Sequence, residues 1–255
     1  MRSIQEELMS RELIHIYGPI SIQSFGLIVA IALSLFTWLV YTHKKRKQLV
    51  SDEQFSAIVF IGVLSGIVGG RLLFVTQEYR NLTNIWDALS FWEGGFSILG
   101  TIVFALGSIL LYLKKNNIPA LPFLDLIAIY APLAQSISRI GCFVAGCCYG
   151  APTNLPWAVA GRHPTQLYSS LSLFIIFLFI RFVATRFCTK PGQLIFLYLA
   201  CAGAERFFTG FWRGDCEIFL KLGFFSMNQW IGLLIAAMGL IAFFYTTIYH
   251  RHTKQ

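Results

Sequence analysis

The chain has 255 residues, of which 56% are hydrophobic and only 13% are charged. These values are typical of a polytopic membrane protein and exclude an ordinary soluble domain. The formal net charge is +8, but the basic residues lie mostly between apolar runs. The charge therefore indicates membrane topology, and we expect no nucleic-acid partner.

Residues 1–20 form a polar N-terminal arm of mixed charge. Ile4, Leu8 and Leu13 recur at nearly helical spacing, and Gly18-Pro19 ends the pattern. We expect a short helix that lies at the membrane surface. The alternative is a poorly ordered terminus.

Residues 21–250 contain seven apolar segments, each close to the length that a helix needs to cross a bilayer. A membrane-spanning segment must satisfy its own backbone, which favours helices. The predicted fold is therefore all-α, with seven transmembrane helices in a single domain. The predicted spans are 21–42, 55–75, 95–113, 121–138, 166–186, 193–211 and 227–249.

Four basic clusters follow the first, third, fifth and seventh segments. They are Lys44-Lys45-Arg46-Lys47, Lys114-Lys115, the group Arg181, Arg186 and Lys190, and the pair Arg251 and Lys254. All four fall on one side if seven helices alternate, and the positive-inside rule makes that side cytoplasmic. We therefore expect the N-terminus outside, the C-terminus in the cytoplasm, and the loops 76–94, 139–165 and 212–226 outside.

Polar residues from six of the helices gather near the outer interface in this topology. Four of them are arginines, whose planar guanidinium groups match phosphate oxygens: Arg71, Arg139, Arg206 and Arg213. Each arginine could alternatively reach the interface or pair with Glu93, Glu205 or Asp215. Because four lie in one layer, we interpret them as a site for a phosphate-bearing lipid.

Further polar residues and glycines lie in the same layer. Pro164 suits the first turn of the fifth helix, which His163 precedes and Gln166 and Tyr168 follow. Glycines permit close approach of a backbone or a ligand, although ordinary helix packing explains them equally well. The remaining candidates for substrate contact are Gly95, Ser97, Gly100, Gly141, Asp215 and Gln229.

Cysteines lie in two of the predicted outer loops. Cys142, Cys147 and Cys148 follow the fourth helix, and Cys216 lies in a later loop. Structural thiols or one disulfide are the first interpretation, redox chemistry the second and a metal site the third. The spacing matches no standard zinc pattern, so no metal or other cofactor is predicted.

The order of the polar motifs resembles the prolipoprotein diacylglyceryl transferase family from about Ile20 to Ile241. One such match would carry little weight, but seven in order are specific. The motifs are Ser24-Phe-Gly26, Gly69-Gly-Arg71, Trp92-Glu-Gly-Gly-Phe-Ser97, Arg139-Ile-Gly141 with Phe143, Gly146 and Gly150, Arg162-His-Pro-Thr-Gln-Leu-Tyr168, Arg206 with Phe-Trp-Arg213-Gly-Asp215, and Ser226-Met-Asn-Gln229.

The resemblance implies a seven-helix transferase of lipoprotein biosynthesis that faces the outer leaflet of the bacterial cell inner membrane. Such enzymes move the diacylglyceryl group of phosphatidylglycerol to the thiol of a lipobox cysteine in the signal peptide of a prolipoprotein, and release glycerol-1-phosphate. The expected partners of this chain are thus phosphatidylglycerol, other membrane lipid and the signal peptide of a prolipoprotein. The reaction requires a thiolate and stabilisation of the departing phosphate.

The resemblance also assigns roles. Arg139 and Arg206 hold the phosphate, while Arg71 and Arg213 position the headgroup. The family's usual histidine is replaced by Leu99, so His163 is the candidate proton acceptor, with a capping role at the helix start as the alternative. Other departures, from asparagine, glutamate or tyrosine, are Phe25, Cys142, Ala145, Cys147 and Gly210.

These departures leave two other functions open. One is a divergent relative that binds or transfers another anionic phospholipid. The other is a membrane thiol–disulfide enzyme that uses the cysteines after the fourth helix, although they lack the usual Cys-x-x-Cys spacing. An ion channel or transporter is disfavoured, because the chain has no inverted repeat and no charges at mid-membrane. Asp125 in the fourth helix is the only counter-signal, and we expect it at the inner interface.

Overall fold

The structure is a computed structural model that describes residues 12–17, 20–79, 95–214 and 225–252. The chain divides into two compact units. The first comprises Met1–Leu13, Ile22–Val40 and Leu124–Gln255, and the second comprises Ile14–Ser21 and Tyr41–Phe123. The single domain expected over residues 21–250, preceded by an arm over 1–20, stays a prediction.

A two-stranded sheet precedes the helices, with β1 over Glu12–Tyr17 and β2 over Ile20–Gln23. The surface helix predicted for the N-terminal arm is therefore wrong over the described part, as is the poorly ordered alternative. Ile14 and Ile16 alternate with Leu13, His15 and Tyr17 in β1. This two-residue period, with β-branched side chains, suits a strand better than a helix.

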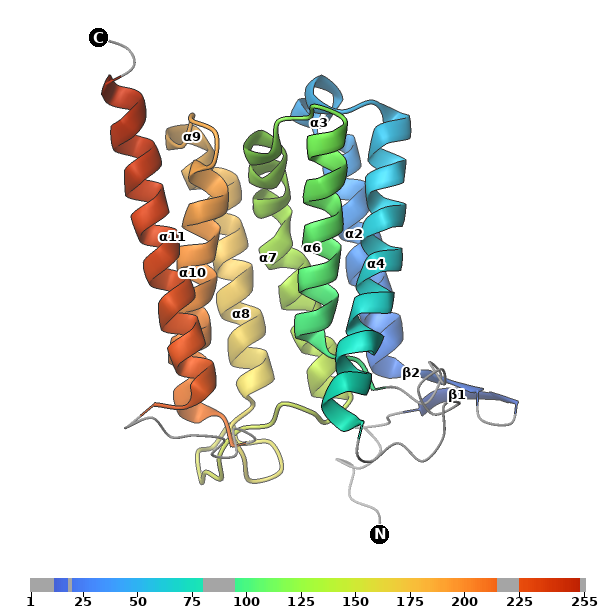
Figure 1. Cartoon of the computed structure of the whole chain (residues 1–255). Coiled ribbons are helices and arrows are strands. Elements are labelled where there is room, and N and C mark those ends of the chain that lie inside the picture. Colours follow the sequence, from blue (N-terminus) through green and yellow to red (C-terminus); the bar gives the residue numbers. More distant parts are fainter. Residues whose placement is uncertain (1–11, 18–19, 80–94, 215–224, 253–255) are drawn as a thin grey trace. The chain divides into compact units, whose positions relative to one another are not determined.

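The first unit carries most of the remaining chain in long helices (Figure 1). A π-helical segment, η2, continues α8 into α9, and a short 3₁₀ segment, η3, ends α10. The elements are α2 Ser24–Thr42, α7 Ala120–Val144, α8 Thr165–Leu178, η2 Phe179–Ala184, α9 Thr185–Phe187, α10 Gln193–Thr209, η3 Gly210–Trp212 and α11 Met227–His252. The last residues of α2 and the first of α7 belong to the second unit.

The second unit contains α3 Lys44–Leu49, α4 Asp52–Glu78 and α6 Ile98–Lys115. A capping box between Ser51 and Gln54 begins α4. Glycines let α6 approach α4 closely. Gly100 of α6 packs on the Gly69-Gly70 pair that precedes Arg71 in α4, and a Cβ added at Gly100 would lie 2.3 Å from the carbonyl oxygen of Gly69. The two helices consequently lie side by side along most of their length (Figure 1).

Seven helices of the described residues are long and apolar enough to cross a membrane, as the sequence predicted. The predicted spans agree closely with six of them. The fourth is longer than predicted, because α7 continues to Val144 rather than ending at Arg139. Ile140 and Phe143 extend its apolar pattern, so Arg139 lies inside the helix, one and a half turns before its end.

Polar contacts connect the helices of the first unit. The hydroxyls of Ser136 and Ser170 donate to each other's backbone carbonyl, at 2.8 and 2.9 Å, and join α7 to α8. The carboxylate of Asp125 accepts hydrogen bonds from the backbone N–H groups of Gly192 and Ile195 at 2.6 and 2.8 Å. Asp125 therefore caps the start of α10, which is a structural role rather than that of a transported-ion ligand.

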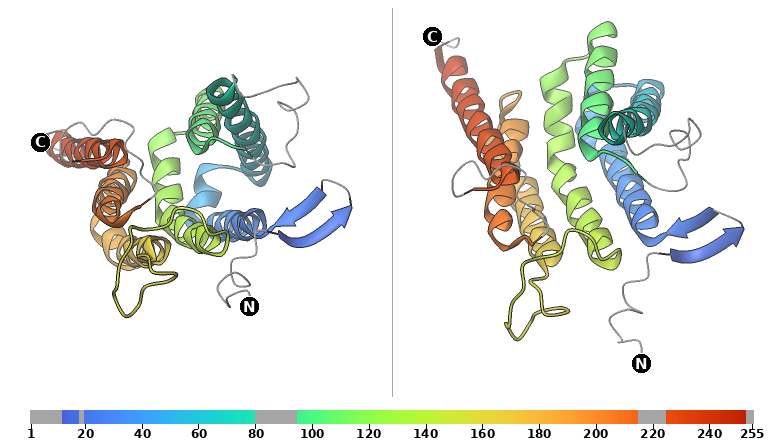
Figure 2. Two further views of the ribbon diagram at one scale, coloured as in Figure 1. Left: turned by 90° about the horizontal axis from the view of Figure 1, so that it is seen from below. Right: turned by 60° about the horizontal axis from the view of Figure 1, so that its bottom comes forward.

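Close backbone packing joins α10 to α11, with α10 between α8 and α11 (Figure 2). A Cβ added at Gly203 would lie 2.5 Å from the backbone nitrogen of Ala236 and 2.6 Å from the carbonyl oxygen of Gly232. Backbone atoms cannot move aside as a flexible side chain can. The absence of a side chain at Gly203 is therefore what allows the two helices to meet.

We predict that alanine changes the stability of the protein differently at two helical glycines. Gly203→Ala should destabilise the protein by about 1–3 kcal/mol, because it forces α10 away from α11. Gly107→Ala, where no atom lies within 4 Å of the added Cβ, should be neutral or stabilise by up to about 1 kcal/mol. Thermal unfolding in detergent measures both; equal unfolding temperatures for the two variants would contradict the packing.

Candidate active site

Three arginines of the first unit line one small pocket, here called the arginine pocket. Arg139 lies in α7, Arg206 lies in α10, and Arg213 directly follows η3. No acidic side chain lines this pocket among the described residues. The complete lining is Arg139, Cys148, Thr165, Gln166, Ser169, Arg206, Thr209 and Arg213. Such a lining favours a ligand with negative charge.

Backbone pairing between two loops places Arg213 at the pocket. Gly150 forms an antiparallel bridge with Arg213, and the N–H of Gly214 donates to the carbonyl of Tyr149 at 3.1 Å. On its other side, the N–H of Gly150 donates to the carbonyl of His163 at 3.1 Å. A Cβ at Gly150 would lie 2.3 Å from that carbonyl oxygen. Glycine is therefore required where the three segments meet.

The turn after α7 is a Schellman motif. The N–H of Gly146 donates to the carbonyl of Phe143, and the N–H of Cys147 donates to the carbonyl of Cys142, both at 3.1 Å. Gly146 has the left-handed conformation that this motif needs, with φ of 68°. Cys148 is also left-handed, with φ of 58°, which costs a residue with a side chain about 1–2 kcal/mol.

Side chains from the first turn of α8 stabilise this strained turn. Gln166 Nε2 donates to the carbonyl of Cys147 at 2.7 Å, and Thr165 Oγ1 donates to the carbonyl of Cys148 at 3.0 Å. Both side chains are buried. A hydrogen bond of this kind contributes about 1 kcal/mol, so the two together offset the strain at Cys148.

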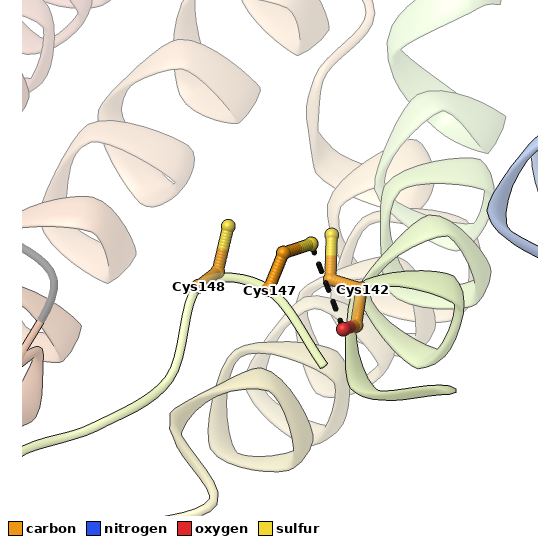
Figure 3. A group of neighbouring side chains, drawn as sticks. All are labelled: Cys142, Cys147 and Cys148. Atoms are coloured by element: carbon orange, nitrogen blue, oxygen red, sulfur yellow. Dashed lines mark hydrogen bonds between the residues drawn. The ribbon is translucent and has the colours of Figure 1, made fainter. Parts of the chain in front are cut away.

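The turn brings three thiols together (Figure 3). The Sγ atoms of Cys142, Cys147 and Cys148 all lie within 4.8 Å of one another. Cys142 is buried and Cys147 is exposed. All five described cysteines are free thiols, so no disulfide joins them, and Cys216 lies outside the described residues.

Hydrogen bonds and nearby charges shift the pKa values of the two thiols that follow α7 in opposite directions. The thiols of Cys142 and Cys147, together with the guanidinium groups of Arg213 and Arg139, hold the pKa of Cys148 well below its ordinary value. The thiols of Cys142 and Cys148, together with burial, raise the pKa of Cys147. Cys148, which lines the arginine pocket, is therefore the group that carries negative charge most readily.

A second pocket of about 850 Å³ lies between α8 and α10, here called the apolar pocket. Its lining is Leu155, Trp157, His163, Tyr168, Ser172, Ile175, Ile176, Cys201, Ala204, Glu205, Phe208, Thr209 and Trp212. Thr209 lines both pockets, and a hydrogen bond of 2.5 Å from Ser169 Oγ to Glu205 Oε1 joins one lining to the other. The two pockets are therefore immediate neighbours.

The structure places His163 and Tyr168 at the apolar pocket rather than the arginine pocket. His163 Nδ1 lies 3.4 Å from the Tyr168 hydroxyl, which also accepts a hydrogen bond of 2.8 Å from Trp157 Nε1. These contacts orient the imidazole at the apolar pocket. The role of His163 as a proton acceptor stays a prediction.

Two further predicted residues of the first unit have packing or capping contacts. Gly141 faces α2, where an added Cβ would lie 3.2 Å from Ile28. Gln229 is buried, and its Oε1 accepts the backbone N–H of Ser226 at 2.9 Å at the start of α11. Asp215 lies outside the described residues.

The remaining predicted residues lie together in the second unit. Arg71 is buried, donates to the carbonyl of Gly95 at 2.9 Å, and lies over the ring of Phe74. Ser97 precedes α6, and its N–H donates to the carbonyl of Gly70 at 3.0 Å. With Gly100 packed on Gly69, these contacts hold Arg71 at the junction of α4 and α6.

Several residues of the two pockets were not predicted from the sequence. Thr165 was interpreted as part of a helix start, Cys148 as a structural thiol, and Glu205 as an alternative partner of an arginine. Ser169 and Thr209 carry no motif of their own. Their helical spacing was the available signal, because Ser169 lies four residues after Thr165 and Thr209 four after Glu205.

The sequence matches one family model over nearly its whole length. A model described as prolipoprotein diacylglyceryl transferase matches residues 11–245. The chain belongs to the prolipoprotein diacylglyceryl transferase family. Residues that the sequence comparison with this family singled out, Arg139, Arg206 and Arg213, are those that the fold gathers at the arginine pocket.

Similar proteins cover most of the chain. The phosphatidylglycerol–prolipoprotein diacylglyceryl transferase of Clostridium tetani is 32% identical over 92% of this chain and 97% of its own length. The protein of that name from Bordetella avium is 32% identical over 93% of this chain and 94% of its own. The one from Thermotoga maritima is 29% identical over 93% of this chain and 85% of its own.

The structure gives a physical reason for one departure from the transferase family pattern. A Cβ at Gly210 would lie 2.5 Å from Cγ of Gln229, so the Gln229 side chain fills the space that a larger residue would need. Cys142 and Cys147, two other departures, belong to the thiol cluster. Leu99 lies exposed on α6, and no contact explains it.

We predict that Thr165→Val loosens the turn after α7. The substitution keeps the side-chain shape but removes the hydroxyl that donates to Cys148, and should destabilise the protein by about 1–2 kcal/mol. Thr246→Val is the matched control, since the Thr246 hydroxyl donates to the carbonyl of Phe243 in its own helix, and it should change stability by less than about 0.5 kcal/mol. Thermal unfolding in detergent compares them; equal losses would contradict the assignment.

Proposed function

We propose that this chain transfers the diacylglyceryl group of phosphatidylglycerol to the thiol of a lipobox cysteine in a secreted prolipoprotein, and releases glycerol-1-phosphate. Family membership supports the class of reaction. The observation that carries the assignment to a site is the lining of the arginine pocket, with three guanidinium groups and no carboxylate among the described residues. A lipid phosphodiester is an anion of suitable chemistry.

The reaction forms a carbon–sulfur bond and breaks the bond between the glyceryl carbon and a phosphate oxygen. The phosphate therefore gains a negative charge as it departs. Guanidinium groups that already surround it stabilise that charge without reorganisation. Arg139 and Arg206 hold the phosphate in this proposal, Arg213 positions the headgroup, and Gln166 fixes the loop beside them.

The apolar pocket suits the acyl part of the same lipid. It is large, mostly apolar, and separated from the arginine pocket by Thr209 and the Ser169–Glu205 hydrogen bond. A phospholipid has one charged end and one apolar end, so neighbouring pockets of these two kinds match it. His163 and Tyr168 would then lie beside the glyceryl backbone, with His163 as the proton acceptor.

The second unit carries a prediction of its own. The family motif Gly69-Gly-Arg71 is the ground for proposing that Arg71, which lies with Gly95, Ser97 and Gly100, contacts a headgroup. In the first unit, Gln229 and Gly141 support the site through packing, and Asp215 is proposed to orient Arg213. These assignments follow from the family motifs rather than from contacts with a lipid.

The protein is a multi-pass membrane protein, and its orientation is part of the proposal. Basic clusters after the first, third, fifth and seventh spans favour a cytoplasmic C-terminus and an outside N-terminus. The ends of α7 and α10 and the starts of α8 and α11 share one end of the first unit (Figure 1). In this orientation that end, with both pockets, faces the outer leaflet of the bacterial cytoplasmic membrane.

We predict that Arg139→Ala and Arg206→Ala each lower transfer about 10²–10³-fold, because each removes a group that stabilises the departing phosphate. The assay is mass spectrometry of a lipobox peptide incubated with the purified protein and phosphatidylglycerol. Transfer adds one diacylglyceryl group to the peptide. A peptide with serine in place of the cysteine should remain unmodified.

Arg181→Ala is the matched control for these variants, since Arg181 lies in η2 at the opposite end of the α8 span. It should keep nearly full turnover. If both pocket variants turn over like the wild type, the site assignment is wrong. If the protein retains bound phospholipid yet modifies no lipobox peptide, it is a relative that acts on another anionic lipid.

We also predict that Ala204→Trp, which fills part of the apolar pocket, lowers transfer from long-chain phosphatidylglycerol more than from a short-chain analogue. The added ring occupies space that the proposal gives to an acyl chain. KM for the long-chain lipid should rise about tenfold, the equivalent of roughly 1.4 kcal/mol of lost binding. An equal effect on both lipids would place the acyl chains elsewhere.

A further inference from the structure

The three thiols after α7 have the geometry of a metal site. Zinc binds sulfur at about 2.3 Å, which places the corners of a tetrahedral site about 3.8 Å apart. The Sγ atoms of Cys142, Cys147 and Cys148 all lie within 4.8 Å of one another. With all three separations at that limit, each sulfur would move inward by about 0.6 Å to reach a common zinc ion. Rotation of a side chain suffices for such a movement.

The backbone holds these thiols in place before any ion binds. The Schellman motif places Cys147 against the carbonyl of Cys142, because the backbone N–H of Cys147 donates to that carbonyl at 3.1 Å. Gln166 and Thr165 fix the carbonyls of Cys147 and Cys148. Ligands that hydrogen bonds already orient lose little conformational freedom on binding, which favours a built site.

The charge of the surroundings also suits such an ion. Zn(II) with three thiolates carries a net charge of −1, and an additional thiolate makes it −2. Cys148 shares the arginine pocket with Arg139, Arg206 and Arg213. Those guanidinium groups offset the charge of the thiolates, which lowers the cost of placing the complex at the membrane interface.

The cluster provides three ligands and leaves room for a fourth. No other histidine, cysteine or carboxylate of the described residues joins it. Cys147 is exposed, so one side of the cluster is open. Structural zinc sites have four protein ligands, whereas catalytic sites have three and an open position for water or substrate.

We infer that Cys142, Cys147 and Cys148 bind a zinc-class divalent cation whose open position takes and deprotonates the acceptor thiol. This inference rests on the proposed transferase function and adds to it the means by which the acceptor becomes a nucleophile. It also gives a use to two family departures, Cys142 and Cys147. The thiol would then sit beside the phosphate that Arg139 and Arg206 hold.

The step balances without an oxidant or a reductant. The acceptor thiol binds the cation, passes its proton to His163, the proton acceptor of the proposed function, and keeps its electron pair as a metal-bound thiolate. The sulfur attacks the glyceryl carbon, and the phosphate oxygen leaves with the electron pair of the broken carbon–oxygen bond. The thioether product is a weaker ligand and dissociates, while the cation remains divalent throughout.

The rate advantage can be bounded. A free thiol with a pKa near 8.5 is about 3% thiolate at pH 7, so complete deprotonation by the cation raises the reactive share by at most about 30-fold. Removal of the metal should lower transfer at pH 7 by up to this factor. Addition of Zn(II) should restore it.

Cobalt(II) is a suitable probe, because cobalt–thiolate bonds absorb in the near ultraviolet. The full-length protein in detergent is stripped with a chelator and titrated with Co(II). One cobalt per chain should bind with thiolate absorption. The absorption should increase when a lipobox peptide is added, as a fourth sulfur joins, and not with the serine peptide.

Cys147→Ala should abolish the cobalt absorption while the fold is kept, since the Cys147 side chain is exposed. Cys142→Ala is a second variant with the same expected loss. Cys188→Ala is the matched control, because this cysteine lies outside the cluster and should leave binding unchanged. Thermal unfolding of the stripped proteins shows whether each variant is folded.

Several results would overturn the inference. Cobalt bound equally by wild type and Cys147→Ala would do so, as would a disulfide within the cluster of the active protein. Full transfer by the stripped protein would remove the metal step while the proposed transferase function stands. If the stripped protein and the reloaded protein both fail to transfer, the proposed function fails. The cobalt spectrum then still decides whether the metal site binds the thiol: no change on addition of the cysteine peptide would overturn the inference.

Discussion

Two hydrogen bonds from the first turn of α8 hold the turn that follows α7. Gln166 and Thr165 donate to the carbonyls of Cys147 and Cys148, and so stabilise a left-handed conformation that a residue with a side chain otherwise avoids. Cys148 thereby enters the lining of the arginine pocket. Both the arginine pocket and the thiol cluster depend on this one connection between helices.

The two pockets share a polar wall, formed by Thr209 and the Ser169–Glu205 hydrogen bond. Burial of a carboxyl group such as Glu205 is costly without hydrogen bonds, and Ser169 supplies one. The wall keeps charged and apolar surfaces distinct over a short distance. A phospholipid makes the same division between its headgroup and its chains, which is why the paired pockets support the proposed substrate.

The stretch from Arg139 to Gly150 contains residues that follow the family pattern and residues that depart from it. Arg139, Gly146 and Gly150 follow the family pattern, and the structure gives each a physical role at the pocket, in the Schellman turn or at the meeting of three segments. Cys142 and Cys147 depart from the pattern, yet they lie beside Cys148 in one cluster. Cys142, Ala145 and Cys147 thus depart from the pattern within this stretch, whereas Phe25, Leu99 and Gly210 depart from it in α2, α6 and η3.

The sequence alone determined the seven membrane spans and the positions of Arg139, Arg206 and Arg213, because hydropathy and charge act locally along the chain. The prediction from sequence was wrong at β1, because the helical spacing of the residues before it outweighed its own two-residue period. It was also wrong at the end of α7, because the left-handed Gly146, and not Arg139, ends that helix. Only the tertiary structure decided that His163 lies at the apolar pocket and that the three thiols converge. Those placements depend on hydrogen bonds between segments up to 20 residues apart, such as Gln166 to Cys147, which no local pattern encodes.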